Sequence, residues 1–111
     1  MTNLISLVIS ALLSVETGGG VKDGDGGLSV GPLQIQPVTV AEANRLSGRS
    51  WTLEDRRSKT ESVAMATVIL THHYNRGTTD PVLLGGRWRN PYSTPPTWYL
   101  RKVRKALERG Q

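Results

Sequence analysis

The sequence predicts a single α+β domain that is mostly helical, with one small β-hairpin. Three observations predict this class. The chain has 111 residues, enough for one domain, and 37% of them are hydrophobic against 21% charged, which suits a packed core. Helix-start signals and helical spacing of apolar residues recur along the chain. Turn residues gather between positions 18 and 36, where they favour a hairpin. No linker or repeat divides the chain, so we expect one domain over residues 1–111.

The first expected element is a helix from about Asn3 to Glu16, which the glycines at positions 18–20 would end. This uncharged start lacks the basic flank and the small-residue cleavage site of a secretion signal. It is also shorter than the roughly 18–20 residues that cross a bilayer. We therefore expect a buried helix, with no visible export signal and no membrane span.

The middle of the chain predicts a hairpin and two helices. Residues 21–36 combine a turn-rich segment with partly alternating apolar residues, which is typical of a small hairpin. A capping-box pattern at Thr39–Glu42 predicts a short helix that ends near Gly48. A second pattern at Ser58–Glu61 opens the strongest helix, to about Tyr74, which Asn75–Gly77 would stop. Its apolar face would carry Val63, Ala66, Ile69 or Leu70, and Tyr74.

The last third of the chain predicts two helices and a loop. Asp80 caps a short helix that runs through Leu84, with Pro81 in its first turn. Three prolines between residues 89 and 97 predict an extended loop. A final amphipathic helix from Trp98 to Arg109 would expose a basic face and bury Val103, Ala106 and Leu107.

The positive charge is concentrated at the C-terminal end. Residues 87–111 hold seven of the 14 basic residues and one of the nine acidic ones, so residues 1–86 hold seven basic and eight acidic residues, a net charge of −1. Such a patch attracts nucleic acid, an anionic membrane or an acidic cell wall, and does not by itself choose among them. A merely solvated helix face is the alternative.

Composition excludes several kinds of site. The chain contains no cysteine, which excludes a disulfide scaffold, a thiol nucleophile and any cysteine-ligated metal. His72 and His73 are adjacent, so on a helix their rings would point about 100° apart, unlike the i, i+4 pair of a helical metal site. We expect neither a metal nor a cofactor.

Glu16 is the strongest candidate catalytic residue. It follows an apolar helix, where burial and the negative helix end both disfavour a charged carboxylate. The glycines after it would let a bulky substrate approach closely. A carboxylic acid that stays protonated near neutral pH suits a general acid in glycosidic cleavage. The alternative is a glutamate that points to solvent.

Two further carboxylates, Asp23 and Asp25, follow in the turn-rich segment. Glycosidases commonly pair one protonated and one ionised carboxyl group, so Asp25, or alternatively Asp23, is the candidate second carboxylate. A calcium loop does not fit, because Leu28 and Gln34 occupy the positions that require Gly and Glu. An ordinary Asp-Gly turn is the alternative.

The segment Ser29–Ile35 is a candidate wall of a ligand site. It contains a Gly-Pro bend and a single polar residue, Gln34, inside an apolar run, which suggests that Gln34 points towards a ligand. No Gly-Lys-Ser/Thr follows the glycines, so the segment is not a phosphate loop.

Taken in order, these segments resemble the lysozyme-like superfamily. Invertebrate-type (destabilase-like) lysozymes and their cysteine-free bacterial and phage relatives carry Glu-Ser-Gly, an Asp before Leu-Ser-x-Gly-x-x-Gln-Ile, Asn-Gly-Gly-Pro and Tyr-Trp-x-x-Val. The corresponding segments here are Glu16–Gly18, Asp25, Leu28–Ile35, Arg87–Pro91 and Tyr99–Val103. Tyr74–Gly77 is similar to a Tyr-Asn-Ala-Gly segment of soluble lytic transglycosylases. The Glu-to-Asp spacing is shorter here, and Asn-Gly-Gly-Pro is reduced to Asn90-Pro91.

The resemblance implies a lysozyme-like fold with the hairpin beside the cleft. It also implies a muramidase that cleaves the β-1,4 bond between N-acetylmuramic acid and N-acetylglucosamine in peptidoglycan. Glu16 would be the general acid and Asp25 the nucleophile or charge stabiliser. The expected substrate contacts are Ser29, Gly31, Gln34, Ile35, Tyr74, Asn75 and Asn90.

The expected partners are glycan strands, and an anionic cell wall bound by the basic last helix, with no specific nucleic acid. Such an enzyme would be made in the cytoplasm and reach the wall through phage lysis, in a virion or by another export route. A lytic transglycosylase that gives 1,6-anhydro products is one alternative. A non-catalytic glycan-binding or virion structural module is a second, and a nucleic-acid binder that uses the basic helix is a third.

Overall fold

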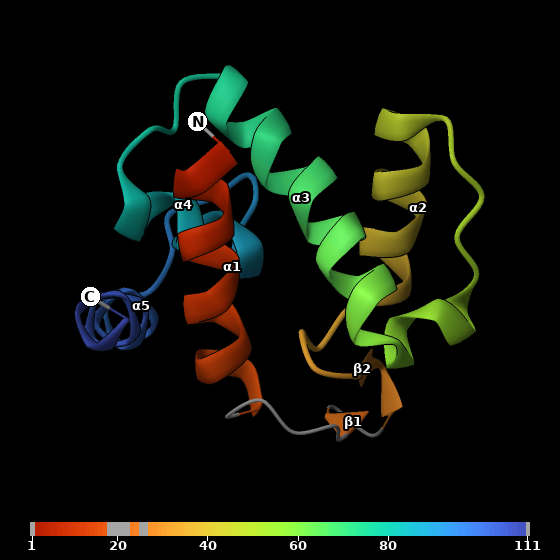
Figure 1. Cartoon of the computed structure of the whole chain (residues 1–111), viewed down its shortest axis with the longest axis horizontal. Coiled ribbons are helices and arrows are strands. Elements are labelled where there is room, and N and C mark those ends of the chain that lie inside the picture. Colours follow the sequence, from red (N-terminus) through yellow and green to blue (C-terminus); the bar gives the residue numbers. More distant parts are fainter. Residues whose placement is uncertain (1, 18–22, 25–26, 111) are drawn as a thin grey trace.

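The computed structural model describes residues 2–17, 23–24 and 27–110, and within these residues the domain is mostly helical, as predicted (Figure 1). Its elements, in chain order, are α1 (Thr2–Thr17), β1 (Asp23–Gly24), β2 (Ser29–Val30), α2 (Pro37–Ser47), the 3-10 helix η2 (Leu53–Arg57), α3 (Lys59–Asn75), α4 (Pro81–Arg89) and α5 (Thr97–Arg109).

Helix α1 lies in the middle of the fold and packs against α3, α4 and α5 (Figure 1). The expected burial is confirmed in part, since Ile5, Val8, Ile9 and Leu12 join the core, whereas Leu7 is 47% exposed. Across residues 2–17, 23–24 and 27–110, no helix has the length and apolar character that crossing a membrane requires. The side chains at the centre of the core include Val8, Leu12, Leu33, Ile35, Met65, Leu70, Leu84 and Val103.

The predicted hairpin is present as a short antiparallel pair, in which Asp23 pairs with Val30 and Gly24 with Ser29. The buried Arg56 of η2 fixes the chain that follows. Its guanidinium Nη1 donates to the carbonyl oxygens of Leu28 at 3.0 Å and Ile35 at 3.1 Å. No periodicity in the sequence marks Arg56, because its partners lie 28 and 21 residues away.

Gly31 is the point of closest approach between the hairpin segment and η2. Its φ angle is +84°, and a Cβ atom there would lie 1.9 Å from the carbonyl oxygen of Arg56. Any side chain would therefore force the two segments apart, and only glycine adopts this backbone conformation without cost.

Helix α2 begins at Pro37, two residues before the predicted start at Thr39. Gln36 is its N-cap, and the capping box predicted at Thr39–Glu42 is wrong. Proline suits the first turn because the N–H that it lacks has no helical partner there. The predicted end is confirmed, since Gly48 closes the helix with a φ of 75°.

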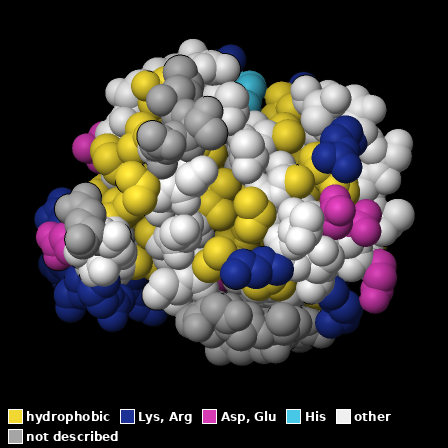
Figure 2. Space-filling view, in the orientation of Figure 1, with side chains coloured by type: hydrophobic (Ala, Val, Ile, Leu, Met, Phe, Trp, Pro, Cys, Tyr) yellow, Lys and Arg dark blue, Asp and Glu magenta, His cyan; other side chains and the backbone are white. Residues whose placement is uncertain are grey.

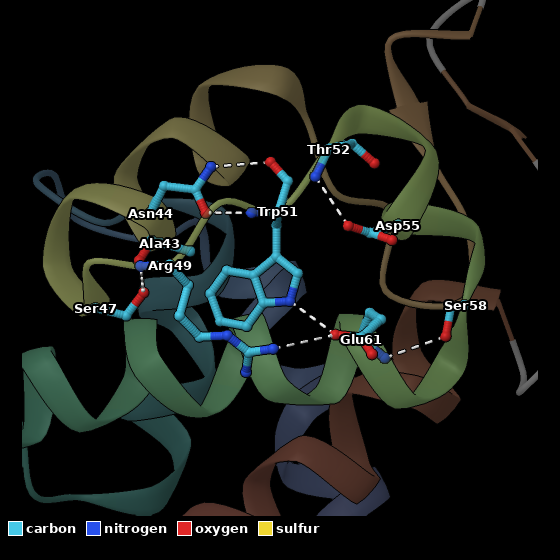
Figure 3. Close-up of polar contacts among 9 residues, drawn as sticks. All are labelled: Ala43, Asn44, Ser47, Arg49, Trp51, Thr52, Asp55, Ser58 and Glu61. Carbon is cyan, nitrogen blue, oxygen red and sulfur yellow. Dashed lines mark hydrogen bonds and ion pairs between the residues drawn. The ribbon is translucent and has the colours of Figure 1, made fainter.

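A polar cluster around Trp51 joins α2 to α3 (Figure 3). The side-chain amide of Asn44 donates to the Trp51 carbonyl at 2.9 Å and accepts from its N–H at 2.8 Å. The indole Nε1 of Trp51 donates to Glu61 at 2.8 Å. The predicted N-cap is confirmed, because Ser58 accepts from the Glu61 N–H. The Glu61 carboxylate binds the tryptophan, so the side chain that was expected to complete a capping box instead links two helices.

The apolar face of α3 differs partly from the prediction. Ala66, Ile69 and Leu70 are buried as expected, whereas Val63 and Tyr74 are half-buried. Ser62 and His73 are buried, although both are polar. The hydroxyl of Ser62 donates to the Arg56 carbonyl at 2.9 Å, which satisfies it inside the core.

Helix α4 is longer than predicted. Asp80 caps it as expected, accepting from the Leu83 N–H at 3.0 Å, but the helix continues past Leu84 to Arg89. The two glycines at positions 85 and 86 do not end it, because they serve a close crossing with α5. A Cβ at Gly85 would lie 2.6 Å from Val103, and one at Gly86 would lie 2.7 Å from Leu100.

The helix predicted from Trp98 to Arg109 is confirmed as α5, which begins one residue earlier, at Thr97. Val103 and Ala106 are buried as predicted, whereas Leu107 is half-buried.

Candidate active site

A cleft of about 450 Å³ opens where the end of α1 meets β2, the start of α2 and the end of α4. Four distant parts of the chain line it, and most of the lining side chains carry a hydroxyl, an amide or a charge. The lining residues are Glu16, Ser29, Gln34, Gln36, Val38, Thr39, Trp88, Arg89, Asn90 and Pro91.

Glu16 is half-buried at the C-terminal end of α1 and lines this cleft. The hydroxyl of Tyr99, on α5, donates a hydrogen bond to its Oε2 atom. Tyr99 is only 2% exposed. Burial, and then the negative charge of Glu16, raise the pKa of the Tyr99 hydroxyl far above its ordinary range. Tyr99 therefore stays protonated and acts as a permanent donor.

This contact fixes the direction of the Glu16 carboxyl group. The hydrogen bond to Oε2 restricts how this carboxyl group can turn within the cleft. The end of the helix and the partial burial disfavour a charged carboxylate, whereas the Tyr99 donor and the positive charge of Arg89, which lines the same cleft, favour it. A carboxyl group held in this way is a candidate acid–base catalyst.

Gln34, Ser29 and Gln36 also line the cleft. Gln34 has a φ of 52°, a left-handed conformation that is uncommon for a residue with a side chain. Its side-chain Nε2 donates to the Gly31 carbonyl at 2.9 Å, which holds the amide in place. Nε2 of Gln36 donates to the Ser29 hydroxyl at 3.4 Å. Strained backbone of this kind is often retained where a side chain must face a ligand.

Asn90, at the end of α4, also lines the cleft. Its Nδ2 donates to the Ser93 hydroxyl at 3.1 Å. Its Oδ1 is buried and has no hydrogen-bond partner among the described residues. Leaving a buried amide oxygen unpaired costs free energy.

Four of the expected contact residues do not line the cleft. Gly31 packs against η2, and Ile35 is 1% exposed within the core. Tyr74 and Asn75 lie at the C-terminal end of α3. Figure 1 shows that this end of α3 is far from the last turn of α1. A short motif placed these two residues in the site, whereas the path of α3 carries them away from it.

The expected second carboxylate, Asp25, lies outside the described residues. The backbone of Asp23 belongs to β1, and its side chain is likewise outside the description. Among the described residues that line the cleft, Glu16 is the one carboxylate.

Sequence reasoning did not assign a role in the site to Trp88, Arg89 or Gln36, and it named Tyr99 only within a family-like segment. Trp88 Nε1 donates to the Leu33 carbonyl at 3.0 Å and so connects α4 to the turn that carries Gln34. One signal could have identified Tyr99. It lies four residues before Val103, on the same helical stripe, and a buried tyrosine hydroxyl needs a partner.

A smaller pocket of about 110 Å³ adjoins the cleft and shares four of its lining residues, Val38, Thr39, Trp88 and Pro91. Above it, the Tyr92 hydroxyl donates to Glu42 at 2.8 Å and links the 90–96 loop to α2. Buried His73 meets the Tyr92 ring edge-on at 5.8 Å. Burial lowers the pKa of His73. In the part of the chain that the structure describes, no group of three His, Asp or Glu side chains could hold a metal ion.

The chain matches no protein-family model, no curated protein and no solved structure. Its function is therefore inferred from the cleft and from the sequence motifs.

Proposed function

We propose that the protein is a lysozyme-type glycosidase with a lysozyme-like fold. It would cleave the β-1,4 bond between N-acetylmuramic acid and N-acetylglucosamine in peptidoglycan. The observation that carries this proposal is the Glu16 carboxyl group, which Tyr99 holds in a cleft whose lining includes three side-chain amides and two hydroxyls. Sugar hydroxyl and acetamido groups pair with such side chains, while an acid at the cleft wall can reach a glycosidic oxygen.

Glu16 would protonate the glycosidic oxygen as the bond to the sugar C1 breaks. The positive charge that develops on the sugar ring then needs a carboxylate or a nucleophile on its other side. Asp25 is proposed for that role because it follows Glu16 by nine residues in a polar turn. Water would complete the reaction and give a free reducing end.

The amides of Gln34 and Asn90 would orient the substrate. The Asn90 side chain lines the cleft, and its Nδ2 is held by the Ser93 hydroxyl at 3.1 Å. Nε2 of Gln34 is bound to Gly31, so the side chain enters the cleft already ordered. Binding would then cost little side-chain entropy.

A lytic transglycosylase is the second candidate. This reaction needs a single carboxylate, and Glu16 is a carboxylate that lines the cleft. In that reaction Glu16 would first protonate the leaving oxygen and then remove the proton from the substrate's own 6-hydroxyl. That oxygen attacks C1, and the product is a 1,6-anhydro sugar.

Digestion of purified peptidoglycan, followed by mass spectrometry of the muropeptides, tests both candidates. Hydrolysis gives reducing-end products, whereas the transglycosylase reaction gives products lighter by one water. No products of either kind would overturn the proposal of an enzyme and favour a glycan-binding or virion structural role. The same digestion of an Asp25→Asn variant decides whether Asp25 takes part, because only the hydrolytic route needs it.

A further inference from the structure

Helix α5 presents one row of cations to solvent. The row contains three cations, which follow Trp98 at i+4, i+7 and i+11: Lys102, Lys105 and Arg109. This spacing places the tryptophan and the cations on one face of the helix. All four are exposed. We call this row, together with Arg89, the cationic stripe. Figure 2 shows Lys and Arg side chains gathered over α5, at the left of the view.

The cations of the stripe are Arg89, Lys102, Lys105 and Arg109. Among the described residues, no ion pair joins any of them to a carboxylate. The single acid of α5, Glu108, falls on the other exposed flank of the helix, beside Arg101 and Arg104. The stripe is therefore a one-sided positive field that an external anion can meet.

Arg89 connects the stripe to the cleft. It lines the cleft, and its guanidinium lies 4.8 Å from the centre of the Trp98 ring. Lys102 Nζ lies 5.4 Å from the same ring. The Trp98 ring therefore contacts both Arg89, which lines the cleft, and Lys102, which lies on α5. From Trp98 to Arg109 the stripe extends about 16 Å at 1.5 Å per residue.

The stripe does not suit a membrane surface. An amphipathic helix binds a bilayer by inserting its apolar face. In α5 that face is already used, because Tyr99, Val103 and Ala106 are buried against the rest of the domain. Only Trp98, 48% exposed, remains on the cationic side.

The difference in charge between the cleft and the cationic stripe indicates which kind of ligand would fit both. The cleft offers amides, hydroxyls and the acidic Glu16, with the cation Arg89 at the point where the cleft meets the stripe, whereas the rest of the stripe is cationic. A matching ligand has a neutral segment that carries hydroxyl and amide groups, joined to an anionic chain. Nucleic acid fits poorly, because it carries a phosphate at every nucleotide and would place phosphates against Glu16.

We propose that the cationic stripe binds a phosphodiester polymer of the teichoic-acid type, attached to the glycan strand that enters the cleft. This inference rests on the proposed function, since it takes the neutral segment to be peptidoglycan. The stripe would hold the anionic branch beside the helix and deliver the strand to Glu16. The preferred substrate is then a wall that carries phosphate polymer.

Binding to insoluble walls tests this proposal. Walls that carry teichoic acid are compared with the same walls after hydrofluoric acid has removed the polymer, at a fixed ionic strength near 0.15 M. All proteins carry Glu16→Gln, so that cleavage does not disturb the measurement. The stripe variant is Lys102→Gln with Lys105→Gln. The matched control is Arg101→Gln with Arg104→Gln, which removes the same charge from the other flank of the same helix.

We expect the stripe variant to bind polymer-bearing walls about tenfold more weakly, which corresponds to two partly screened contacts. The control variant should lose less than about threefold, and the two variants should bind stripped walls alike. Equal losses in both variants would overturn the proposal, because net charge alone would explain them. Equal binding of the parent protein to the two kinds of wall would also overturn it, as would tighter binding to a DNA duplex at the same salt concentration.

Turnover of stripped walls by the unmodified protein is measured in parallel. Turnover without stripe-dependent binding means that the enzyme proposal stands and the stripe proposal fails. Stripe-dependent binding without turnover refutes the enzyme and leaves a wall-binding protein.

Discussion

Replacing Tyr99 with phenylalanine tests whether this hydroxyl positions the catalytic acid. The substitution removes one oxygen and keeps the ring that fills the core. Because the Tyr99 hydroxyl is buried and donates to a carboxyl group, its hydrogen bond belongs to the class worth about 1.5–3 kcal/mol. Glu16 is half-buried and recovers part of this through water, so we expect the free energy of unfolding to fall by about 1–2 kcal/mol.

Activity should change in two ways. An untethered carboxyl group samples unproductive directions, so kcat should fall about tenfold, equivalent to roughly 1.4 kcal/mol in the barrier. The carboxylate also loses a donor that favours its charged form, so the acid form persists to higher pH. The basic limb of the pH–activity profile should therefore move upward.

Tyr92→Phe is the matched control. The Tyr92 hydroxyl also donates to a carboxylate, that of Glu42, but the ring is 72% exposed and lies outside the cleft. We expect a change below about 0.5 kcal/mol in unfolding and no shift of the pH profile. The measurements are urea unfolding and initial rates on purified peptidoglycan across pH. If Tyr99→Phe keeps both the kcat and the pH profile of the unmodified protein, the positioning role is refuted, whatever happens to stability.

Two further predictions concern the fold. Gly85→Ala places a Cβ 2.6 Å from Val103, so it should lower the unfolding free energy by about 1–3 kcal/mol. Gly110→Ala is the control, because its nearest contacts are at 3.6 Å, and it should change the unfolding free energy by less than about 0.5 kcal/mol. Equal effects of the two variants in a denaturant titration would refute the close crossing of α4 and α5. Burial lowers the pKa of His73 below its ordinary 6.5, so the unfolded chain binds the proton more readily, and stability should be complete above pH 6.5 and fall as the pH drops below it. His73→Leu should flatten this slope between about pH 5 and 6.5 and His72→Gln should keep it, and identical slopes in both variants would show that His73 is not the cause.

Most helices could be predicted because local signals specify them. Ser58 and Asp80 accept from backbone N–H groups three residues later, and such caps can be read from short segments. The predicted α4 is too short because the prediction treats Gly85 and Gly86 as the end of the helix. Their role is to allow the close contact with α5, which is distant in the sequence. The start of α2 was missed because a proline at the first turn competed with a capping pattern two residues later.

The cleft residues, too, could be predicted where a short segment specifies them and could not where a distant contact does. Glu16, Ser29, Gln34 and Asn90 were expected to share a site, and all four line one cleft. The hydrogen bond that organises them, from Tyr99 to Glu16, joins residues 83 positions apart and has no local signature. Arg56 escaped notice for the same reason, since its partners include carbonyls 28 and 21 residues away. Tyr74 and Asn75 show the opposite error, in which a short motif was given a role that the path of its helix does not allow.

The most direct test of the central claim compares Glu16→Gln with the unmodified protein on a soluble, uncharged peptidoglycan oligosaccharide. Glu54→Gln is the matched control, because Glu54 lies on η2, is exposed and is absent from the cleft lining. The proposal predicts that Glu16→Gln lowers turnover by at least about a hundredfold while the oligosaccharide still binds, and that Glu54→Gln behaves like the unmodified protein. Turnover that survives in Glu16→Gln would contradict the assignment of Glu16 as the catalytic acid.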